Sequence, residues 1–208
     1  MYKQLEMNIR KIFPNLEWKK SKFIAAGWDH DILMLDHKFV ARIPKNSDAK
    51  KRMQIDFCLL TYLQNKIDTD IPAAILKDDK TKIAIYKVVA GTAIAESRYK
   101  KLSASEKDKF AKNIAVFLSQ IHKLPVADIR KCQVPIKSIV SQNREVKNNI
   151  RFVYSHLTQQ EKTALNNFII SRKHLIKEIK QVLIHGDLSS DNVFVDKQSK
   201  NNLGIIDF

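Results

Sequence analysis

The fold is decided by one stretch of sequence, which reads Val182-Leu183-Ile184-His185-Gly186-Asp187-Leu188-Ser189-Ser190-Asp191-Asn192-Val193-Phe194-Val195-Asp196 and, after a polar turn, Leu203-Gly204-Ile205-Ile206-Asp207-Phe208. An apolar run enters a polar loop that carries a carboxylate at Asp187 and an amide at Asn192, and two short apolar strands then lead to a second carboxylate at Asp207. A carboxylate can accept the proton of an attacking hydroxyl, and carboxylate and amide oxygens suit the magnesium ions that bridge nucleotide phosphates. This order predicts a phosphoryl-transfer site, with Asp187 as the catalytic base and Asn192 and Asp207 as metal ligands.

The pattern His-x-Asp-x-x-x-x-Asn, followed by a strand, a turn and an apolar-apolar-Asp strand, matches the catalytic loop and metal aspartate of protein kinases. Two segments are closer to another family than to protein kinases: the sequence His-Gly-Asp-Leu-Ser-Ser-Asp-Asn at 185–192 and the sequence Ile-Ile-Asp-Phe at 205–208. They resemble the aminoglycoside phosphotransferase family, which comprises antibiotic kinases related to protein kinases and choline kinases. The alternative is a strand–loop–strand hairpin whose acidic residues only solvate a turn, and we expect Asp191 and Asp196 to do no more than that.

The resemblance implies an α+β, bilobal, protein-kinase-like fold. Residues 1–90 would form a nucleotide-binding lobe around an antiparallel sheet, and residues 91–208 a mainly helical catalytic lobe. Family members continue past the metal aspartate with helices that build the acceptor pocket, whereas this sequence stops at Phe208. We therefore expect a truncated catalytic lobe, with at most slow nucleotide hydrolysis and no aminoglycoside resistance from these 208 residues.

Composition places the chain among globular proteins, since 208 residues with 44% hydrophobic content can fill a core. No apolar run is long enough to span a bilayer and the first residues do not resemble a signal peptide, so we expect a cytoplasmic protein without a membrane partner. Cys58 and Cys132 stand alone in unlike contexts. We expect them to be reduced, partly buried thiols rather than a disulfide or a metal site.

The charge is strongly positive, because 37 Lys and Arg face 22 Asp and Glu and give a net charge of +15. Such an excess attracts polyanions, but a nucleic-acid reader should show a recognition module or basic and aromatic residues interleaved on one element. The lysines are instead spread along nearly every segment, which favours a solvated surface. A pocket for polycationic aminoglycosides should be lined with carboxylates, which the sequence does not obviously supply.

Three antiparallel strands are predicted within Ser21–Pro44, with a turn at Asp36 and His37. Gly27 lies in the first turn, where kinases fold a loop over the nucleotide phosphates. One glycine alone predicts only a hairpin, and the resemblance is what makes Gly27 a candidate for cofactor binding.

Arg42 on the third strand is the candidate for gripping the nucleotide phosphates, because kinases place a cation there and a guanidinium can bind phosphate through two hydrogen bonds. It replaces the usual lysine, and the alternative is an edge-strand arginine that points to solvent. Lys45 is a second, weaker candidate. A helix is predicted at Lys51–Lys66, and the resemblance makes its Asp56 the carboxylate that orients the cation, although a plain surface carboxylate is also open.

Two further strands are predicted at Ile71–Leu76 and Ile83–Val89. The segment from Val88 through Val89 to Gly91 resembles the family's linker between lobes, where the backbone offers an acceptor and a donor to the purine. We expect the nucleotide to bind there, and sequence does not distinguish ATP from GTP.

Helices are predicted at Tyr2–Phe13, after a capping box at Ser103 to Glu106, and after a second capping box near Thr158 that would carry the helix past Leu175 and Ile179. His185 is expected to hold the catalytic loop through hydrogen bonds rather than to exchange protons with substrate.

Three functions remain open. The first is magnesium-dependent transfer of the terminal phosphate of ATP or GTP to a hydroxyl of a small molecule, either aminoglycoside-like or another metabolite. The second is a truncated, inactive nucleotide-binding relative of such a kinase. The third is a basic nucleic-acid-associated protein, which would bind with a steep salt dependence.

Overall fold

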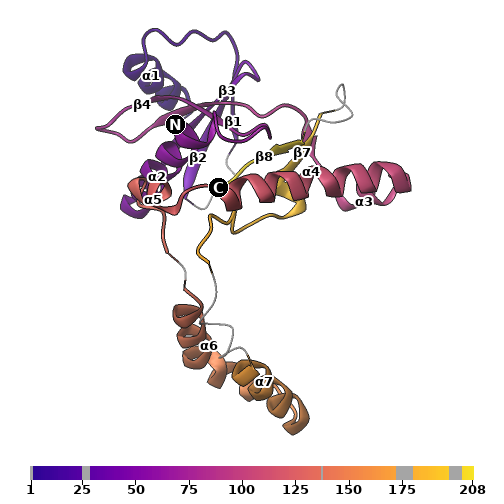
Figure 1. The fold of residues 1–208 in the computed structure, drawn as a ribbon. Helices are drawn as coiled ribbons and strands as arrows, with labels where there is room; N and C mark the ends of the chain where they lie inside the picture. The colour runs from indigo at the N-terminus through magenta and orange to yellow at the C-terminus, as the bar shows by residue number, and fades with distance from the viewer. Residues whose placement is uncertain (1, 25–28, 137, 172–179, 197–202) are drawn as a thin grey trace. The chain divides into compact units, whose positions relative to one another are not determined.

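The computed structural model describes residues 2–24, 29–136, 138–171, 180–196 and 203–208 (Figure 1). These residues divide into two compact units, one formed by Met1–Gln133 with Val182–Phe208 and the other by Val134–Gln181. The boundaries of these units differ from those of the predicted lobes at 1–90 and 91–208. The two lobes remain a prediction.

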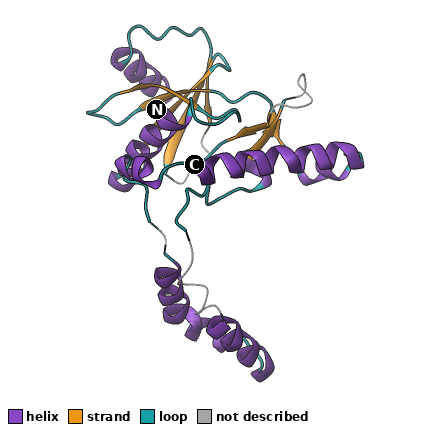
Figure 2. Cartoon of the chain, viewed as in Figure 1, coloured by secondary structure: helices purple, strands orange, loops and turns teal. Residues whose placement is uncertain are grey.

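An antiparallel sheet of five strands forms the first part of the larger unit, in the spatial order β1-β2-β3-β5-β4. Figure 2 shows the strands in orange. Their bounds are β1 Ser21–Ile24, β2 His30–Leu35, β3 Phe39–Pro44, β4 Ala73–Lys77 and β5 Ala84–Lys87. The predicted antiparallel strands are confirmed, and the predicted Asp36–His37 turn has both residues at positive φ, as a tight hairpin turn requires.

The two faces of this sheet have different partners, because successive side chains of a strand point to opposite faces. On one face Leu33 and Ala41, which pair across β2 and β3, pack with the helix α1 (Tyr2–Ile12). The core on this side has eight buried members: Ile9, Phe13, Trp18, Leu33, Leu35, Ala41, Ile83 and Ile85. The neighbouring pair Ile32 and Arg42 therefore belongs to the other face.

That second face is approached by α2 (Ser47–Leu63), the helix predicted at 51–66. It begins four residues earlier than predicted, because the Asn46 side chain accepts a hydrogen bond from the Ala49 amide at 2.8 Å and caps the first turn. Met53 contacts the sheet directly, since the Tyr86 hydroxyl lies 3.1 Å from its Sδ atom. The helix is thus anchored over the strands that carry Arg42 and Tyr86.

A second, three-stranded antiparallel sheet has the order β6-β7-β8, with β6 at Thr92–Ala93, β7 at Val193–Val195 and β8 at Leu203–Ile205. It confirms the predicted pair of strands after the catalytic loop, whose connecting turn lies outside the described residues. Gly91 precedes β6 at φ +95°, and a Cβ atom there would lie 2.5 Å from the Val195 carbonyl carbon. Only glycine allows the predicted linker to run this close to β7.

Helices complete the larger unit: α3 at Glu96–Lys100, α4 at Ala104–Lys123 and α5 at Val126–Lys131. The predicted capping box is present at the start of α4, where Ser103 and Glu106 exchange hydrogen bonds. The buried side chains of α4 are Phe117 and Ile121.

The smaller unit consists of α6 (Ile139–Tyr154) and α7 (Gln159–Ser171). The predicted capping box begins α7, because Thr158 and Glu161 exchange side-chain and backbone hydrogen bonds. The predicted continuation past Leu175 and Ile179 lies outside the described residues. Among the helices that the structure describes, none is long and apolar enough to cross a membrane.

The two cysteines correct one expectation. Cys58 on α2 and Cys132 at the end of α5 form a disulfide, with Cα atoms 5.4 Å apart, and the expectation of two reduced thiols was wrong. The two residues are 74 positions apart in sequence. Their spacing gave no sign that α2 and the end of α5 meet, because that contact depends on tertiary packing.

The disulfide closes a loop of 74 residues, so reduction should lower the free energy of unfolding by about 2–4 kcal/mol. Urea unfolding of the oxidised chain, with and without dithiothreitol, measures the difference. The double variant Cys58→Ser/Cys132→Ser is the control, and dithiothreitol should leave its midpoint unchanged. Two titratable thiols in the unfolded, untreated protein would contradict the linkage.

Candidate functional site

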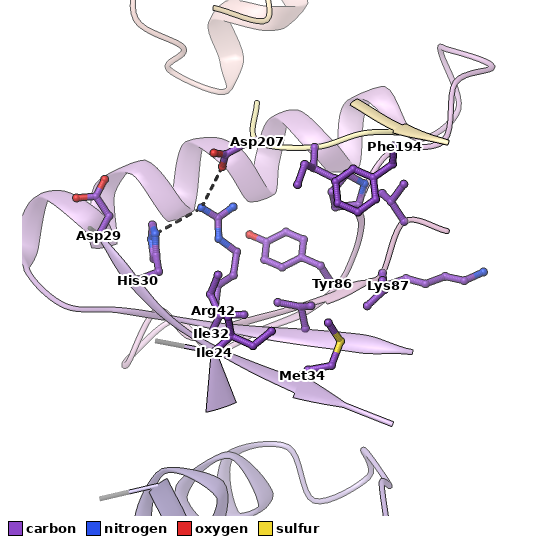
Figure 3. A pocket seen from close by; sticks show the side chains of 15 residues that line it. Ile24, Asp29, His30, Ile32, Met34, Arg42, Tyr86, Lys87, Phe194 and Asp207 are labelled. Carbon is purple, nitrogen blue, oxygen red and sulfur yellow. Dashed lines mark hydrogen bonds and ion pairs between the residues drawn. The ribbon is translucent and has the colours of Figure 1, made fainter. Parts of the chain in front are cut away.

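A cavity of about 540 Å³ opens on the α2 side of the five-stranded sheet (Figure 3). This volume is in the range of small-molecule sites. Its lining comes from both sheets and the segments that join them: Ile24, Asp29, His30, Ile32, Met34, Val40, Arg42, Pro72, Tyr86, Lys87, Val88, Val89, Phe194, Ile206 and Asp207. All of these residues belong to the larger unit.

The lining is apolar over most of its surface, and Asp29, Arg42 and Asp207 are grouped at one end, with Lys87 apart from them. Strand alternation explains the apolar part, because Ile32 and Val40 lie on the same face as Arg42 while their neighbours face the core. Figure 3 shows Phe194 across the cavity from Met34, and Arg42 directed toward Asp207. The cavity can therefore hold a flat apolar group beside a group that carries negative charge.

Arg42 projects from the central strand β3, between β2 and β5. Its side chain is 21% exposed, and its guanidinium lies 3.5 Å from Asp56 and 4.0 Å from Asp207. The alternative of an edge-strand arginine pointing to solvent is therefore wrong. Lys45, the second candidate, lies 3.1 Å from Asp31 and is not among the residues that line the cavity.

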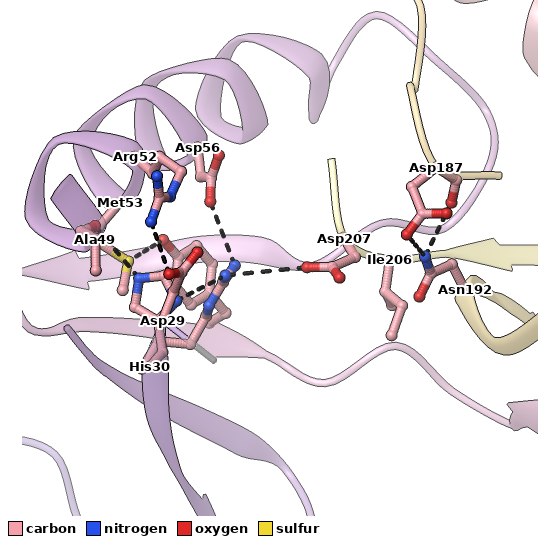
Figure 4. Close-up of polar contacts among 12 residues, drawn as sticks. Asp29, His30, Ala49, Arg52, Met53, Asp56, Asp187, Asn192, Ile206 and Asp207 are labelled. Atoms are coloured by element: carbon pink, nitrogen blue, oxygen red, sulfur yellow. Dashed lines mark hydrogen bonds and ion pairs between the residues drawn. The ribbon is translucent and has the colours of Figure 1, made fainter. Parts of the chain in front are cut away.

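Asp56 reaches Arg42 in spite of being one methylene shorter than glutamate (Figure 4). Its side chain is only 16% exposed. Burial raises the pKa of Asp56 to about 6, the charge of Arg42 lowers it, and the nearby charge of Asp207 raises it further. Asp56 is therefore not a plain surface carboxylate, and at pH 7 it is mostly ionised beside the guanidinium.

Two neighbours of this ion pair were missed in the sequence. Asp29 forms an ion pair of 2.7 Å with Arg52 of α2. His30 is buried, with its Nδ1 atom 3.4 Å from Arg42 and its Nε2 atom 3.4 Å from the Ala49 carbonyl. Strand alternation was the signal that could have found His30, since it lies two residues before Ile32 on the face of Arg42.

The predicted catalytic loop is held together by the side chain and backbone of Asn192. Its Nδ2 atom donates to the Asp187 carbonyl at 2.9 Å and to the Asp187 carboxylate at 3.1 Å (Figure 4). Its backbone carbonyl accepts from the Ile206 amide at 3.0 Å. These bonds bring the predicted base Asp187 and the predicted metal ligand Asn192 together, and they set Asn192 beside the residue that precedes Asp207.

The buried side chain of His185 contacts the same loop through hydrogen bonds. The Asp187 amide donates to its Nδ1 atom at 3.3 Å, and its Nε2 atom lies 3.0 Å from the Ile206 carbonyl. Burial holds the pKa of His185 below its ordinary value. Its ring packs against Phe117 of α4 and Phe208. The predicted hydrogen bonds are thus confirmed, and both ring nitrogens are used inside the protein.

The oxygen atoms of Asn192 and Asp207 fit a magnesium ion by their chemistry. Both Nδ2 hydrogens of Asn192 are directed to Asp187, which leaves Oδ1 as the atom that Asn192 can offer a cation. The Asp207 side chain is 61% exposed. Amide and carboxylate oxygens are the ligands of Mg²⁺, which also keeps waters and phosphate oxygens in its shell. In the described part of the chain no group of three or more His, Cys, Asp or Glu residues could hold a metal by itself.

The remaining candidates have different outcomes. Val88 and Val89 line the cavity, next to Tyr86 and Lys87 of β5. Gly27 lies outside the described residues. Arg42 and Asp207 line the cavity, whereas Asp56 is not among the lining residues and contacts Arg42 from α2.

The sequence model of one protein family, described as the phosphotransferase enzyme family, matches residues 20–208. Among solved structures, the GDP and kanamycin complex of APH(2")-IIIa is 21% identical with a TM-score of 0.83, and the match covers 98% of this chain and 71% of that chain. The streptomycin–ATP–APH(2")-IIa complex is 23% identical, with a TM-score of 0.73 and coverage of 98% and 69%. Macrolide 2'-phosphotransferase MphH from Brachybacterium faecium is 13% identical, with a TM-score of 0.74 and coverage of 100% and 71%. These similarities confirm the predicted kinase-like α+β fold, and this chain spans about 70% of the length of those structures.

The raised pKa of Asp56 gives a test of its environment. A carboxyl with a folded pKa of about 6, above its ordinary 3.8, binds a proton more tightly in the folded state, so its contribution to stability is present in acid and is lost as pH rises toward 6. The free energy of unfolding of the wild type, minus that of Asp56→Asn, should fall by up to about 3 kcal/mol from pH 4 to pH 6.5 and then level off.

Urea unfolding in EDTA, without nucleotide, measures this difference across the pH range. Asp48→Asn, at the exposed start of the same helix, controls for loss of one negative charge from α2. A difference between the wild type and Asp56→Asn that stays flat from pH 4 to pH 6.5 would contradict a raised pKa.

Proposed function

The chain belongs to the phosphotransferase enzyme family, and on that premise we propose that it moves the terminal phosphate of ATP or GTP to a hydroxyl of a small molecule. The observation that carries the proposal is the position of Arg42. Its guanidinium lies at one end of a mainly apolar cavity, between Asp56 and Asp207. A nucleotide has the matching form, with a flat base at one end and negative phosphates at the other.

The purine base of the nucleotide would lie between two pairs of side chains. Ile32 and Val40 of the sheet would be on one side, and Phe194 and Ile206 on the other. The polar edge of the base would meet the backbone of the predicted linker, from Val88 through Val89 to Gly91. The Val88 amide already donates to the Lys38 carbonyl at 2.9 Å, so we assign the donor to Val89, which also lines the cavity.

The phosphates would extend to Arg42. A guanidinium offers parallel N–H donors to phosphate oxygens, and it stays charged at any relevant pH. Asp56 contributes by holding the guanidinium from the α2 side. Asn192 and Asp207 would hold magnesium, which bridges the phosphate oxygens and neutralises charge that develops during transfer.

Asp187 would accept the proton of the acceptor hydroxyl. Its carboxylate is exposed, and the Asn192 amide holds one of its oxygen atoms, Oδ2. A base needs to lie within hydrogen-bond reach of the proton it removes, so a rotamer fixed by Asn192 lowers the cost of reaching that geometry.

The acceptor is proposed only as a small molecule with a free hydroxyl. The solved relatives include complexes with kanamycin, streptomycin and gentamicin, all bound to those proteins. A net charge of +15 opposes long-range attraction of a polycation to this chain. An acceptor with fewer positive charges than an aminoglycoside therefore fits the charge of the chain better.

Nucleotide binding should stabilise the fold. Magnesium with ATP or GTP at a hundredfold excess over the dissociation constant should add about 2.7 kcal/mol to the free energy of unfolding. Asp207→Asn removes one negative ligand and should abolish the part of this gain that depends on magnesium. Thermal unfolding with nucleotide, in magnesium and in EDTA, gives the measurement. Asp191→Asn, an exposed carboxylate of the same loop, is the matched control and should keep the full gain.

Loss of the catalytic base should slow phosphate transfer without loss of nucleotide binding. Asp187→Asn keeps the shape of the side chain, and its turnover should be about 10²–10⁴-fold lower. Nucleotide affinity should change little, because Asp187 does not line the nucleotide cavity. Phosphate release and transfer to a panel of hydroxyl acceptors measure the turnover. A variant with full turnover on every accepted substrate would show that Asp187 is not the base.

A further inference from the structure

His30 lies at the start of β2 and joins two elements of the nucleotide site. It pairs with Pro44 in the β2–β3 register, two positions from the pair formed by Ile32 and Arg42, so its side chain shares their face of the sheet. His30 is only 6% exposed. Figure 3 shows its ring linked to Arg42, and Figure 4 shows the ring beside Ala49 in the first turn of α2.

The hydrogen-bond partners of His30 determine which nitrogen carries its proton. Arginine can only donate, so the Nδ1 atom that lies 3.4 Å from the Arg42 guanidinium has to accept and carries no proton. A carbonyl can only accept, so the Nε2 atom that lies 3.4 Å from the Ala49 carbonyl has to donate. One neutral tautomer, with the proton on Nε2, satisfies both contacts at once.

The surrounding charges favour this neutral form. Burial, and next the charge of Arg42, hold the pKa of His30 below its ordinary value. Arg52 from α2 acts in the same direction, whereas the Ala49 carbonyl and Asp29 act against it. An imidazolium would lose its acceptor atom and would place a second cation against the guanidinium.

A neutral partner suits a cation that has to bind phosphate. Asp56 and Asp207 both neutralise part of the charge of Arg42, and Asp207 also serves as a proposed metal ligand. Of the side chains that pair with the guanidinium through a hydrogen bond or an ion pair in the described part of the chain, His30 is the uncharged one. The centroid of the Tyr86 ring lies 5.8 Å from the guanidinium carbon. His30 fixes a direction for the guanidinium without adding negative charge that would repel a nucleotide.

We propose that neutral His30 is a positioning residue, which ties the guanidinium of Arg42 to the first turn of α2 and holds it toward the nucleotide phosphates. This inference rests on the proposed nucleotide site. Asp56 holds the guanidinium from the middle of α2, and His30 holds it from the backbone at the start of the same helix. The position of α2 would therefore affect the position of the Arg42 guanidinium through two separate contacts, one with Asp56 and one with His30.

The first test measures the tautomer directly in the unaltered chain, and a variant serves only to assign the signal. Long-range proton–nitrogen NMR of the chain at pH 7 should show the His30 ring protonated on Nε2 alone. The spectrum of His30→Gln identifies the signal by its loss. A ring protonated on Nδ1, or on both nitrogens, would overturn the proposal.

The second test measures dissociation constants for magnesium ATP and magnesium GTP in matched variants. His30→Asn keeps an acceptor near the position of Nδ1, and His30→Gln keeps a donor near the position of Nε2. The Gln variant should bind the nucleotide about tenfold more weakly, and the Asn variant should stay within about threefold of the wild type. Equal losses in the two variants would contradict a role directed at Arg42.

A third test asks whether the effect of His30→Gln depends on Arg42, which distinguishes a positioning residue from one that only supports the fold. In an Arg42→Ala background His30→Gln should cause no further loss, because the group it positions is absent. The same tenfold loss in both backgrounds would show that His30 only supports the fold, and circular dichroism checks that each variant is folded. If the wild type binds neither nucleotide, the proposed function fails, whereas the tautomer measurement still decides whether His30 and Arg42 are linked.

Discussion

The permanent charge of Arg42 inside the wall of an apolar cavity is the constraint on which the rest of the site depends. A guanidinium cannot be neutralised by losing its proton, so a partly buried position requires partners. The chain supplies them from three places: Asp56 on α2, Asp207 after β8, and His30 on β2. These residues are far apart in sequence, and a shared cation brings them to one end of the cavity.

The same arrangement explains why the carboxylates near Arg42 are not equivalent. Burial raises the pKa of Asp56, which needs the guanidinium beside it to remain ionised at neutral pH. Asp207 is largely exposed and lies farther from the guanidinium, so it remains available to a metal ion. In the proposed function, Asp56 would hold the guanidinium and Asp207 would meet the phosphates through magnesium.

The catalytic loop follows a different principle, because it is held by hydrogen bonds and ring packing rather than by charge. The Asn192 amide and the Nδ1 atom of His185 bind within the loop, and the Nε2 atom of His185 ties the loop to the Ile206 carbonyl after β8. Phe208 packs on the His185 ring next to Phe117 of α4. The loop therefore depends on the core of the larger unit. Its exposed carboxylate at Asp187 is the proposed catalytic base.

The sequence by itself determined the order of the strands along the chain, the main helices with their capping boxes, and the kinase-like loop from His185 to Asn192, because these depend on contacts within a few residues. It also singled out Arg42 and Asp56. Tertiary structure decided that Arg42 lies on a central strand, that Asp56 is close enough to pair with it, and that His30 completes the set. Tertiary structure also decided that Cys58 and Cys132 form a disulfide. Each of these features joins residues from different elements, and the distance between two elements is fixed by packing of the whole core rather than by the spacing of residues along the chain.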